Sequence, residues 1–231
     1  LEIDLKNVNP FFQFLEEDIY VAEDSRVRSS YNSDKIKLNV DIASDLITYE
    51  GMKFTDIKLV SYFDSVRANI QYQISKVELS DSLGVSNAAL FCYVKDNKFS
   101  TNIGWDALGN VEPALFAFNT HLQENKDVVT EFKPSFFFLK SQKWDINPDS
   151  KLLWNKDIFE FTDFEIVNGD HLVDLHGKVS HDPKDWLYFQ VKDFDLEALN
   201  GLTGGIDLGG ILNIQGGVSD VYNNIRFMSV S

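Results

Sequence analysis

The sequence predicts an all-β fold, mostly antiparallel, with one or two short helical turns. Three observations predict it. Apolar and polar residues alternate along most of the 231-residue chain, as in strands with one apolar and one polar face. Turn-forming residues separate these runs at intervals of roughly 8 to 15 residues, which favours hairpins over βαβ units. Long helical periodicity is absent.

Four segments carry the alternation most clearly: 35–42, 67–75, 171–180 and 185–193. Apolar residues share one parity in each of them, and Lys, Asn, Gln, Asp or His occupy most of the other parity. Three further runs, 88–94, 114–118 and 135–139, are apolar at both parities. These three runs are expected to be strands covered on both faces.

Two short pieces are predicted to be helical turns. The first, "NPFFQFL", offers Asn9 as N-cap and Pro10 at the first helical position. The second, "DLEALN", offers Asp195 as N-cap, with Leu196 and Leu199 on one face. The two pieces lie in similar contexts, because segments 5–42 and 191–230 both place a helical turn between strands and then an alternating strand. This similarity indicates an internal repeat with a boundary near 191–205. Residues 1–231 are accordingly expected to be a single β-rich segment of a longer, repeat-like protein.

Composition excludes several partners. The net charge is −15, from 21 basic and 36 acidic residues. Nucleic acid is therefore not an expected partner, because its binding depends on Lys and Arg neutralising phosphates. An anionic membrane surface is disfavoured for the same reason. The one cysteine, Cys92, allows no intrachain disulfide and no cysteine-built metal site.

Catalytic and metal-binding motifs are not found in the sequence. His171, His176 and His181 recur every five residues, but in a strand that spacing alternates between faces, and a turn interrupts it. The glycines of "GLTGGIDLGG" precede a strand, so they lack the helix N-terminus that binds phosphate. The sequence predicts no metal, no cofactor and no enzymatic activity. A carboxylate pair of the glycosidase type stays open, because 36 acidic residues always supply candidates.

The apolar strand residues have two interpretations. They form a closed core, or they line an open groove, and alternation alone does not separate the two. The candidates for lining a lipid groove are Ile70, Tyr72, Ile74, Phe116, Phe118, Phe136, Phe138, Phe159, Phe161, Val173, Leu175, Leu187, Phe189 and Val191.

The segment from 135 to 224 resembles the TamB-like members of the AsmA superfamily (translocation and assembly module), in their Bacteroidetes form. The resemblance rests on a strand followed by "SHDPKD" at 173–185, on "DFDLEALN" at 193–200, and on the glycine-bearing strand at 205–217. "YEGMKFTDIKLVS" extends it loosely upstream. "GGIDLGGIL" is denser in glycine than the family's usual form.

The resemblance implies a strongly curled, taco-like, elongated sheet with one apolar concave face. It also implies a periplasmic segment whose parent protein is anchored in the inner membrane. The implied function is non-enzymatic: an apolar β-trough that carries phospholipid acyl chains between inner and outer membranes, or that assists outer-membrane protein assembly with a Bam-like barrel protein. The alternative is a secreted all-β binding module for a carbohydrate or protein ligand, since four Trp and eight Tyr permit sugar stacking.

Overall fold

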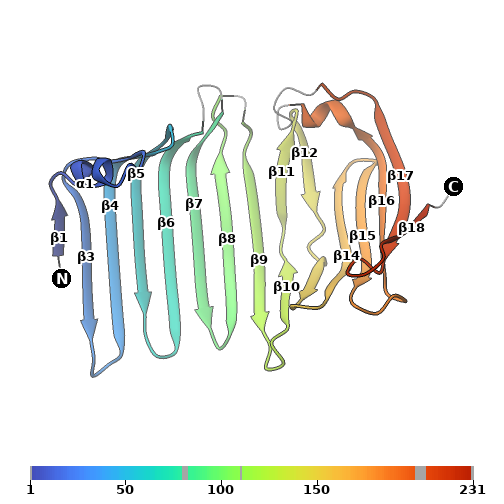
Figure 1. The fold of residues 1–231 in the computed structure, drawn as a ribbon, viewed down its shortest axis with the longest axis horizontal. Helices are drawn as coiled ribbons and strands as arrows, with labels where there is room; N and C mark the ends of the chain where they lie inside the picture. Colours follow the sequence, from blue (N-terminus) through green and yellow to red (C-terminus); the bar gives the residue numbers. More distant parts are fainter. Residues whose placement is uncertain (1, 80–82, 110, 201–206, 230–231) are drawn as a thin grey trace. The chain divides into compact units, whose positions relative to one another are not determined.

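The structure, a computed structural model, describes residues 2–79, 83–109, 111–200 and 207–229. It confirms the all-β prediction: strands dominate and pair antiparallel, with two short helical turns (Figure 1). The chain divides into two units, residues 1–115 and 116–231. The joint expected near 191–205 falls within the second unit, and residues 201–206 of it lie outside the described part of the chain.

Unit 1 is a meander of long hairpins. Its elements are β1 (Glu2–Leu5), α1 (Asn9–Phe14), β2 (Ile19–Val21), β3 (Ser25–Asn32), β4 (Lys37–Tyr49), β5 (Met52–Phe63), β6 (Arg67–Glu78), β7 (Gly84–Lys95) and β8 (Lys98–Asp106). Strand β1 pairs with β3, and from β3 to β8 each strand pairs with the one that follows it in sequence. The short strand β2 pairs with the end of β4. Figure 1 shows β3 to β8 running side by side.

Tight two-residue turns set the register of several hairpins. Glu50 and Gly51 join β4 to β5, and Asp96 and Asn97 join β7 to β8, all four with positive φ. This backbone is the type I′ turn, whose twist matches that of the flanking strands. The pairing of Lys95 with Lys98 across the second turn follows directly.

A kink crosses the strands of unit 1 near one end. Asp56 in β5 and Asn87 in β7 have positive φ, 52° and 49°, which Asp and Asn tolerate better than most residues. Ladder pairing is interrupted beside both residues. Side chains three positions apart, such as Ile74 and Val77, consequently meet in one cluster. Ile57, Ile74 and Val77 form this small buried core.

Unit 2 is also an antiparallel meander. Its elements are β9 (Ala114–Leu122), which begins two residues before the unit boundary, β10 (Val128–Phe132), β11 (Ser135–Leu139), β12 (Gln142–Ile146), β13 (Lys151–Trp154), β14 (Phe159–Asn168), β15 (His171–Val179), β16 (Trp186–Asp195), η1 (Leu196–Leu199), β17 (Ile211–Ser219) and β18 (Arg226–Ser229). From β14 to β18, each strand pairs with the next.

In two places in unit 2, two short consecutive strands, β10 with β11 and β12 with β13, pair with one longer strand. Both β12 and β13 pair with β14, and β9 pairs with both β10 and β11. The breaks fall at Lys133–Pro134 and at 147–150, where Pro134 cannot donate to the ladder. Buried serine hydroxyls bond the backbone there: Ser135 accepts from the Ala117 N–H at 2.8 Å, and Ser150 donates to the Asp163 carbonyl at 2.8 Å.

Both predicted helical turns are present, with one correction. Asp195 caps η1 as expected, because its carboxylate accepts from the Glu197 N–H at 3.0 Å. Asn9 does not cap α1, which begins at Asn9 itself and has Val8 at the cap position without a side-chain bond. The Asn9 amide instead pairs with the backbone N–H and C=O of Val21, at 2.8 and 3.1 Å. This longer-range pairing ties α1 to β2. Within the described ranges, no helix has the length and apolar character needed to cross a membrane.

Candidate functional site: the apolar sheet faces

One face of the unit 1 sheet is apolar across six adjacent strands, and we name it the unit 1 apolar face. Residues directly opposite in register share a face, so the row through Tyr72 also contains Leu59 and Leu90. Neighbouring rows repeat the pattern. The face comprises Val27, Leu38, Val40, Ile42, Leu59, Phe63, Ile70, Tyr72, Ile74, Ala88, Leu90, Cys92, Val94, Phe99 and Ile103, with Ser44, Ile57, Ser61 and Thr101 among them.

Burial alternates along β6, β7 and β8 of this sheet. In β6, Ile70 and Tyr72 are half-buried and Ile74 is buried, whereas Asn69, Gln71 and Gln73 are exposed. Strands β7 and β8 alternate in the same way between 90 and 103. The apolar face is therefore distinct from the face that water covers.

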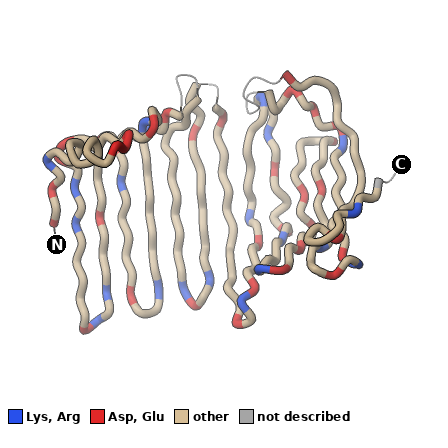
Figure 2. Tube along the Cα trace, in the orientation of Figure 1, with Lys and Arg blue, Asp and Glu red and all other residues tan. Residues whose placement is uncertain are grey.

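The apolar face is weakly hydrated and free of formal charge near its middle. Burial raises the pKa of the Tyr72 phenol above its ordinary value, because the phenolate loses hydration there. Lys, Arg, Asp and Glu are absent from 68–75, 84–94 and 99–105. Figure 2 shows the consequence: charged positions in β6, β7 and β8 gather at the strand ends and turns.

The accessible surface of the chain is larger than that of compact proteins of the same mass. A compact monomer of this mass exposes roughly 10,600 Å², and two separate compact domains of half the mass expose roughly 12,800 Å² together. The chain exposes 14503 Å². Only nine hydrophobic side chains of the described residues are fully buried. Much of the apolar face is thus half-exposed.

Unit 2 has an apolar face of its own, built around aromatic rings. Phe118 contacts Phe132, which contacts Phe164, which contacts Phe161, with ring centroids 6.2, 5.4 and 5.6 Å apart. Phe161 and Phe164 share this face because the bulge beside Asp163, whose φ is 48°, shifts the register between them. Apolar residues of β15 and β16 continue the face, and among them Leu175 and Phe189 stand directly opposite each other in register.

The structure places twelve of the fourteen groove candidates on these two faces. Ile70, Tyr72 and Ile74 lie on the unit 1 apolar face. On the unit 2 apolar face lie Phe116, Phe118, Phe159, Phe161, Val173, Leu175, Leu187, Phe189 and Val191.

Phe136 and Phe138 are the exceptions, and their grouping is corrected. Side chains of three consecutive phenylalanines alternate in a strand, so Phe137 takes one face and the other two take the opposite one. Phe137 pairs with Trp144 and stacks on Phe116 at 6.3 Å. Phe136 pairs with Asp145 and lies under the Lys143 ammonium, 5.0 Å from its ring centroid.

Of the three doubly apolar runs, 88–94 is corrected as well, since β7 is covered on one face only. Phe91 and Tyr93 remain 39% and 41% exposed, opposite the half-buried Leu90 and Cys92. Sequence reasoning also missed several members of the apolar faces, chiefly Leu59, Leu90, Phe132 and Phe164. Parity within their own strands would have identified Leu59 and Leu90, but Phe164 depends on the bulge.

Three of the four histidines have local partners in the structure. His171 bonds the Asp193 carbonyl, His176 bonds the Asp174 carboxylate at 2.9 Å, and His181 packs on Tyr222 at 4.4 Å between ring centroids. In the described part of the chain, no three His, Cys, Asp or Glu side chains gather as metal ligands would.

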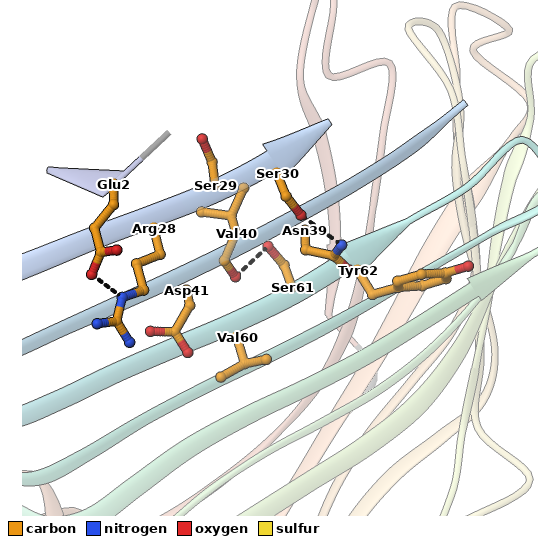
Figure 3. A pocket seen from close by; sticks show the side chains of 10 residues that line it. All are labelled: Glu2, Arg28, Ser29, Ser30, Asn39, Val40, Asp41, Val60, Ser61 and Tyr62. Atoms are coloured by element: carbon orange, nitrogen blue, oxygen red, sulfur yellow. Dashed lines mark hydrogen bonds and ion pairs between the residues drawn. The ribbon is translucent and has the colours of Figure 1, made fainter. Parts of the chain in front are cut away.

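A shallow groove of about 490 Å³ lies in unit 1 (Figure 3). Its lining includes Arg28, which is ion-paired with Glu2, and Asn39, whose amide donates to Ser30 at 3.0 Å. Tyr62, Asp41 and the 50%-exposed Val60 also line it, and they lie on the face opposite the unit 1 apolar face. Ser29, Val40 and Ser61 line the groove as well, although in register they belong to the unit 1 apolar face.

A search of protein-family models, of curated proteins and of solved structures finds no match to this chain. The function is therefore inferred from the sheet faces and from the sequence resemblance alone.

Proposed function

We propose that the chain is a non-enzymatic segment that carries phospholipid acyl chains along its apolar sheet faces. The observation that carries this proposal is the unit 1 apolar face: six adjacent strands present half-exposed apolar side chains on one side and mostly polar ones on the other. A face of this kind lowers the free energy of an acyl chain without any reacting group.

The energetics favour a long apolar ligand. Each methylene withdrawn from water contributes about 0.8 kcal/mol, so a tail of roughly 16 carbons gains on the order of 12 kcal/mol from complete burial. Six strands at about 4.8 Å spacing span roughly 24 Å. One leaflet of a bilayer's hydrocarbon is about 15 Å thick, so this width accommodates an acyl chain.

The resemblance to TamB-like proteins supports a cellular location for the proposed lipid transport. On this proposal the chain is periplasmic, and its parent protein is anchored in the inner membrane. Phospholipid moves between inner and outer membranes along the apolar faces, and a Bam-like barrel protein is the proposed outer-membrane partner. A carbohydrate- or protein-binding module is the alternative, and the exposed aromatics of the opposite face are the observation that favours it.

Binding of NBD-labelled phosphatidylethanolamine, followed by fluorescence, tests the proposal. Tyr72→Asp places a charge at the centre of the apolar face, and Gln71→Asp places the same charge one residue away on the exposed face. We expect Tyr72→Asp to weaken binding at least about tenfold and Gln71→Asp to leave it unchanged. Equal affinities for the two variants, or no binding by the unmodified chain, would contradict the proposal.

A further inference from the structure

The face of unit 1 opposite the apolar face carries exposed aromatic rings where charged residues would be expected. Phe91 and Tyr93, on β7, are 39% and 41% exposed, and Tyr62 of β5 is half-exposed on the same side. Ring faces open to water on a sheet otherwise lined with polar groups have no role in the acyl-chain proposal. We name this surface the aromatic-amide face.

Register organises this face into rows. Asn39, Tyr62, Asn69, Tyr93 and Ser100 stand directly opposite one another on β4 to β8. The adjacent row is Asp41, Val60, Gln71, Phe91 and Asn102. Tyr62 and Tyr93 are therefore two strands apart, about 10 Å, with the Asn69 amide between them. Stacking surfaces alternate with hydrogen-bonding amides along a line across the sheet.

This alternation fits an extended oligosaccharide. A pyranose ring has an apolar C–H face that packs on an aromatic ring, and hydroxyls at its edge that pair with amides and hydroxyls. The separation of Tyr62 and Tyr93 is close to the repeat of a disaccharide unit, so a sugar stacked on Tyr93 places the next sugar but one beside Tyr62 and the cations over its ring. The groove of Figure 3 continues the row at Tyr62, Asn39 and Ser30 toward β3.

The charges at one end of the face select the kind of sugar. Lys37 and Arg67 lie 5.8 and 5.4 Å from the centroid of the Tyr62 ring. Lys95 and Lys98 pair across the β7–β8 turn, at the end of the strand that holds Tyr93. The Asp64 carboxylate, in the β5–β6 turn, accepts hydrogen bonds from the Tyr62 hydroxyl and the Arg67 side chain. Asp34 and Asp96 lie in the turns at the same end, but Lys35, Lys37, Arg67, Lys95 and Lys98 outnumber these two carboxylates and Asp64, so the border complements an anionic ligand.

We propose that the aromatic-amide face binds an extended acidic oligosaccharide of the uronic-acid class. Tyr93 and Phe91 stack on sugar rings, the amides bind hydroxyls, and the basic border, which includes the cations over the Tyr62 ring, binds carboxylates. Single-stranded nucleic acid is the less suitable ligand, because amides outnumber cations in the rows and the acidic chain repels a polyphosphate at long range. The site lies on the opposite side of the sheet from the acyl-chain site and does not depend on it.

Calorimetric titration of the whole chain tests this proposal, with oligogalacturonate and hyaluronan oligosaccharides as acidic probes, cello-oligosaccharide as the neutral probe and poly(U) as the nucleic-acid probe. We expect binding of at least one acidic probe that weakens with added salt. Tighter binding of the neutral probe or of poly(U), or binding of neither acidic probe, overturns the proposal.

Matched variants locate the site. Tyr93→Ala and Phe91→Ala remove exposed rings from this face, and each should weaken acidic-probe binding at least about tenfold. Tyr49→Ala removes a ring of equal exposure, 40%, at the far end of β4 and should leave the affinity unchanged. Lys95→Gln with Lys98→Gln should reduce the salt dependence. Retained affinity in the ring variants, with circular dichroism showing an intact sheet, contradicts the assignment.

Discussion

The Ser150 hydroxyl bridges two backbone groups across a broken strand: it donates to the Asp163 carbonyl at 2.8 Å and accepts from the Glu165 N–H at 3.3 Å. Ser150 has no exposed surface, so water cannot replace these bonds. The hydroxyl thus takes over the backbone pairing that the interruption between β12 and β13 removes. Ser135 and the Ser25–Ser44 pair, whose hydroxyls are 2.7 Å apart, act similarly at other breaks.

Ser150→Ala should therefore lower the free energy of unfolding by about 1–3 kcal/mol, because it removes the hydroxyl's bonds to both the Asp163 carbonyl and the Glu165 N–H and leaves the carbonyl only the longer bond from the Asn147 amide at 3.4 Å. Urea denaturation measures this change. Ser100→Ala, on the exposed face of β8, is the control and should have little effect. Equal stabilities of the two variants would show that the bridge contributes nothing.

Asp64 should make the stability of the β5–β6 hairpin depend on pH. Hydrogen bonds from the Tyr62 hydroxyl, and then from the Val66 and Arg67 backbone and side chain, lower the pKa of its carboxyl below the ordinary value. A lowered folded-state pKa stabilises the fold above the unfolded pKa of about 3.9, and this contribution is lost as pH falls through the folded pKa.

Asp64→Asn should consequently lower Tm at neutral pH, and the difference from the unmodified chain should shrink as pH falls below about 4. Thermal unfolding followed by circular dichroism across this range checks the trend. Asp96→Asn, in the exposed β7–β8 turn, serves as the control. A Tm difference that stays constant between neutral and acidic pH would refute the assigned role of the carboxylate.

Gly177 should tolerate no side chain. Its φ is 100°, and an added Cβ would lie 2.3 Å from the Trp186 carbonyl oxygen on the neighbouring strand. Gly169 also has a positive φ, 56°, but an added Cβ would meet nothing within 4 Å. Gly169→Ala should cost about 1 kcal/mol of unfolding free energy, whereas Gly177→Ala should cost about 3 kcal/mol or more. Similar losses in urea denaturation would rule out the close approach of β15 and β16.

Asn9 should matter through its pairing with Val21 and not through helix capping. Asn9→Ala removes two hydrogen bonds to the β2 backbone and should lower the free energy of unfolding by about 1–2 kcal/mol. Asn9→Asp keeps a capping oxygen but loses the donor to the Val21 carbonyl, so it should also destabilise the chain. An Asn9→Asp variant as stable as the unmodified chain would favour a capping role instead.

Strand alternation allowed the faces of unit 1 to be predicted because its hairpins have regular registers. Ile70, Tyr72 and Ile74 could be grouped from parity alone, and the structure places them together. Parity fails where a residue with positive φ enters a strand. The side-by-side placement of Ile74 with Val77, and of Phe161 with Phe164, depends on pairing with other strands, which the local sequence does not specify.

The buried serines were not predictable either. Ser25, Ser44, Ser135 and Ser150 resemble ordinary polar residues in sequence, and their burial follows from strand breaks that only the paired neighbours reveal. Phe136 and Phe138 show the opposite error, since they were assigned to the groove by hydrophobicity although the structure places Phe137, of the other parity, on the apolar face. Cross-strand contacts, which span many residues, decide each of these cases.

Site-specific photo-crosslinking along β6 tests the central claim most directly. Benzophenone side chains at positions 69, 70, 71 and 72 are presented to phospholipid vesicles, and crosslinked lipid is detected by mass spectrometry. The account predicts crosslinks from 70 and 72, on the apolar face, and none from 69 and 71. Crosslinks without this period of two, or from 69 and 71 alone, would contradict the proposal that acyl chains lie on the apolar face.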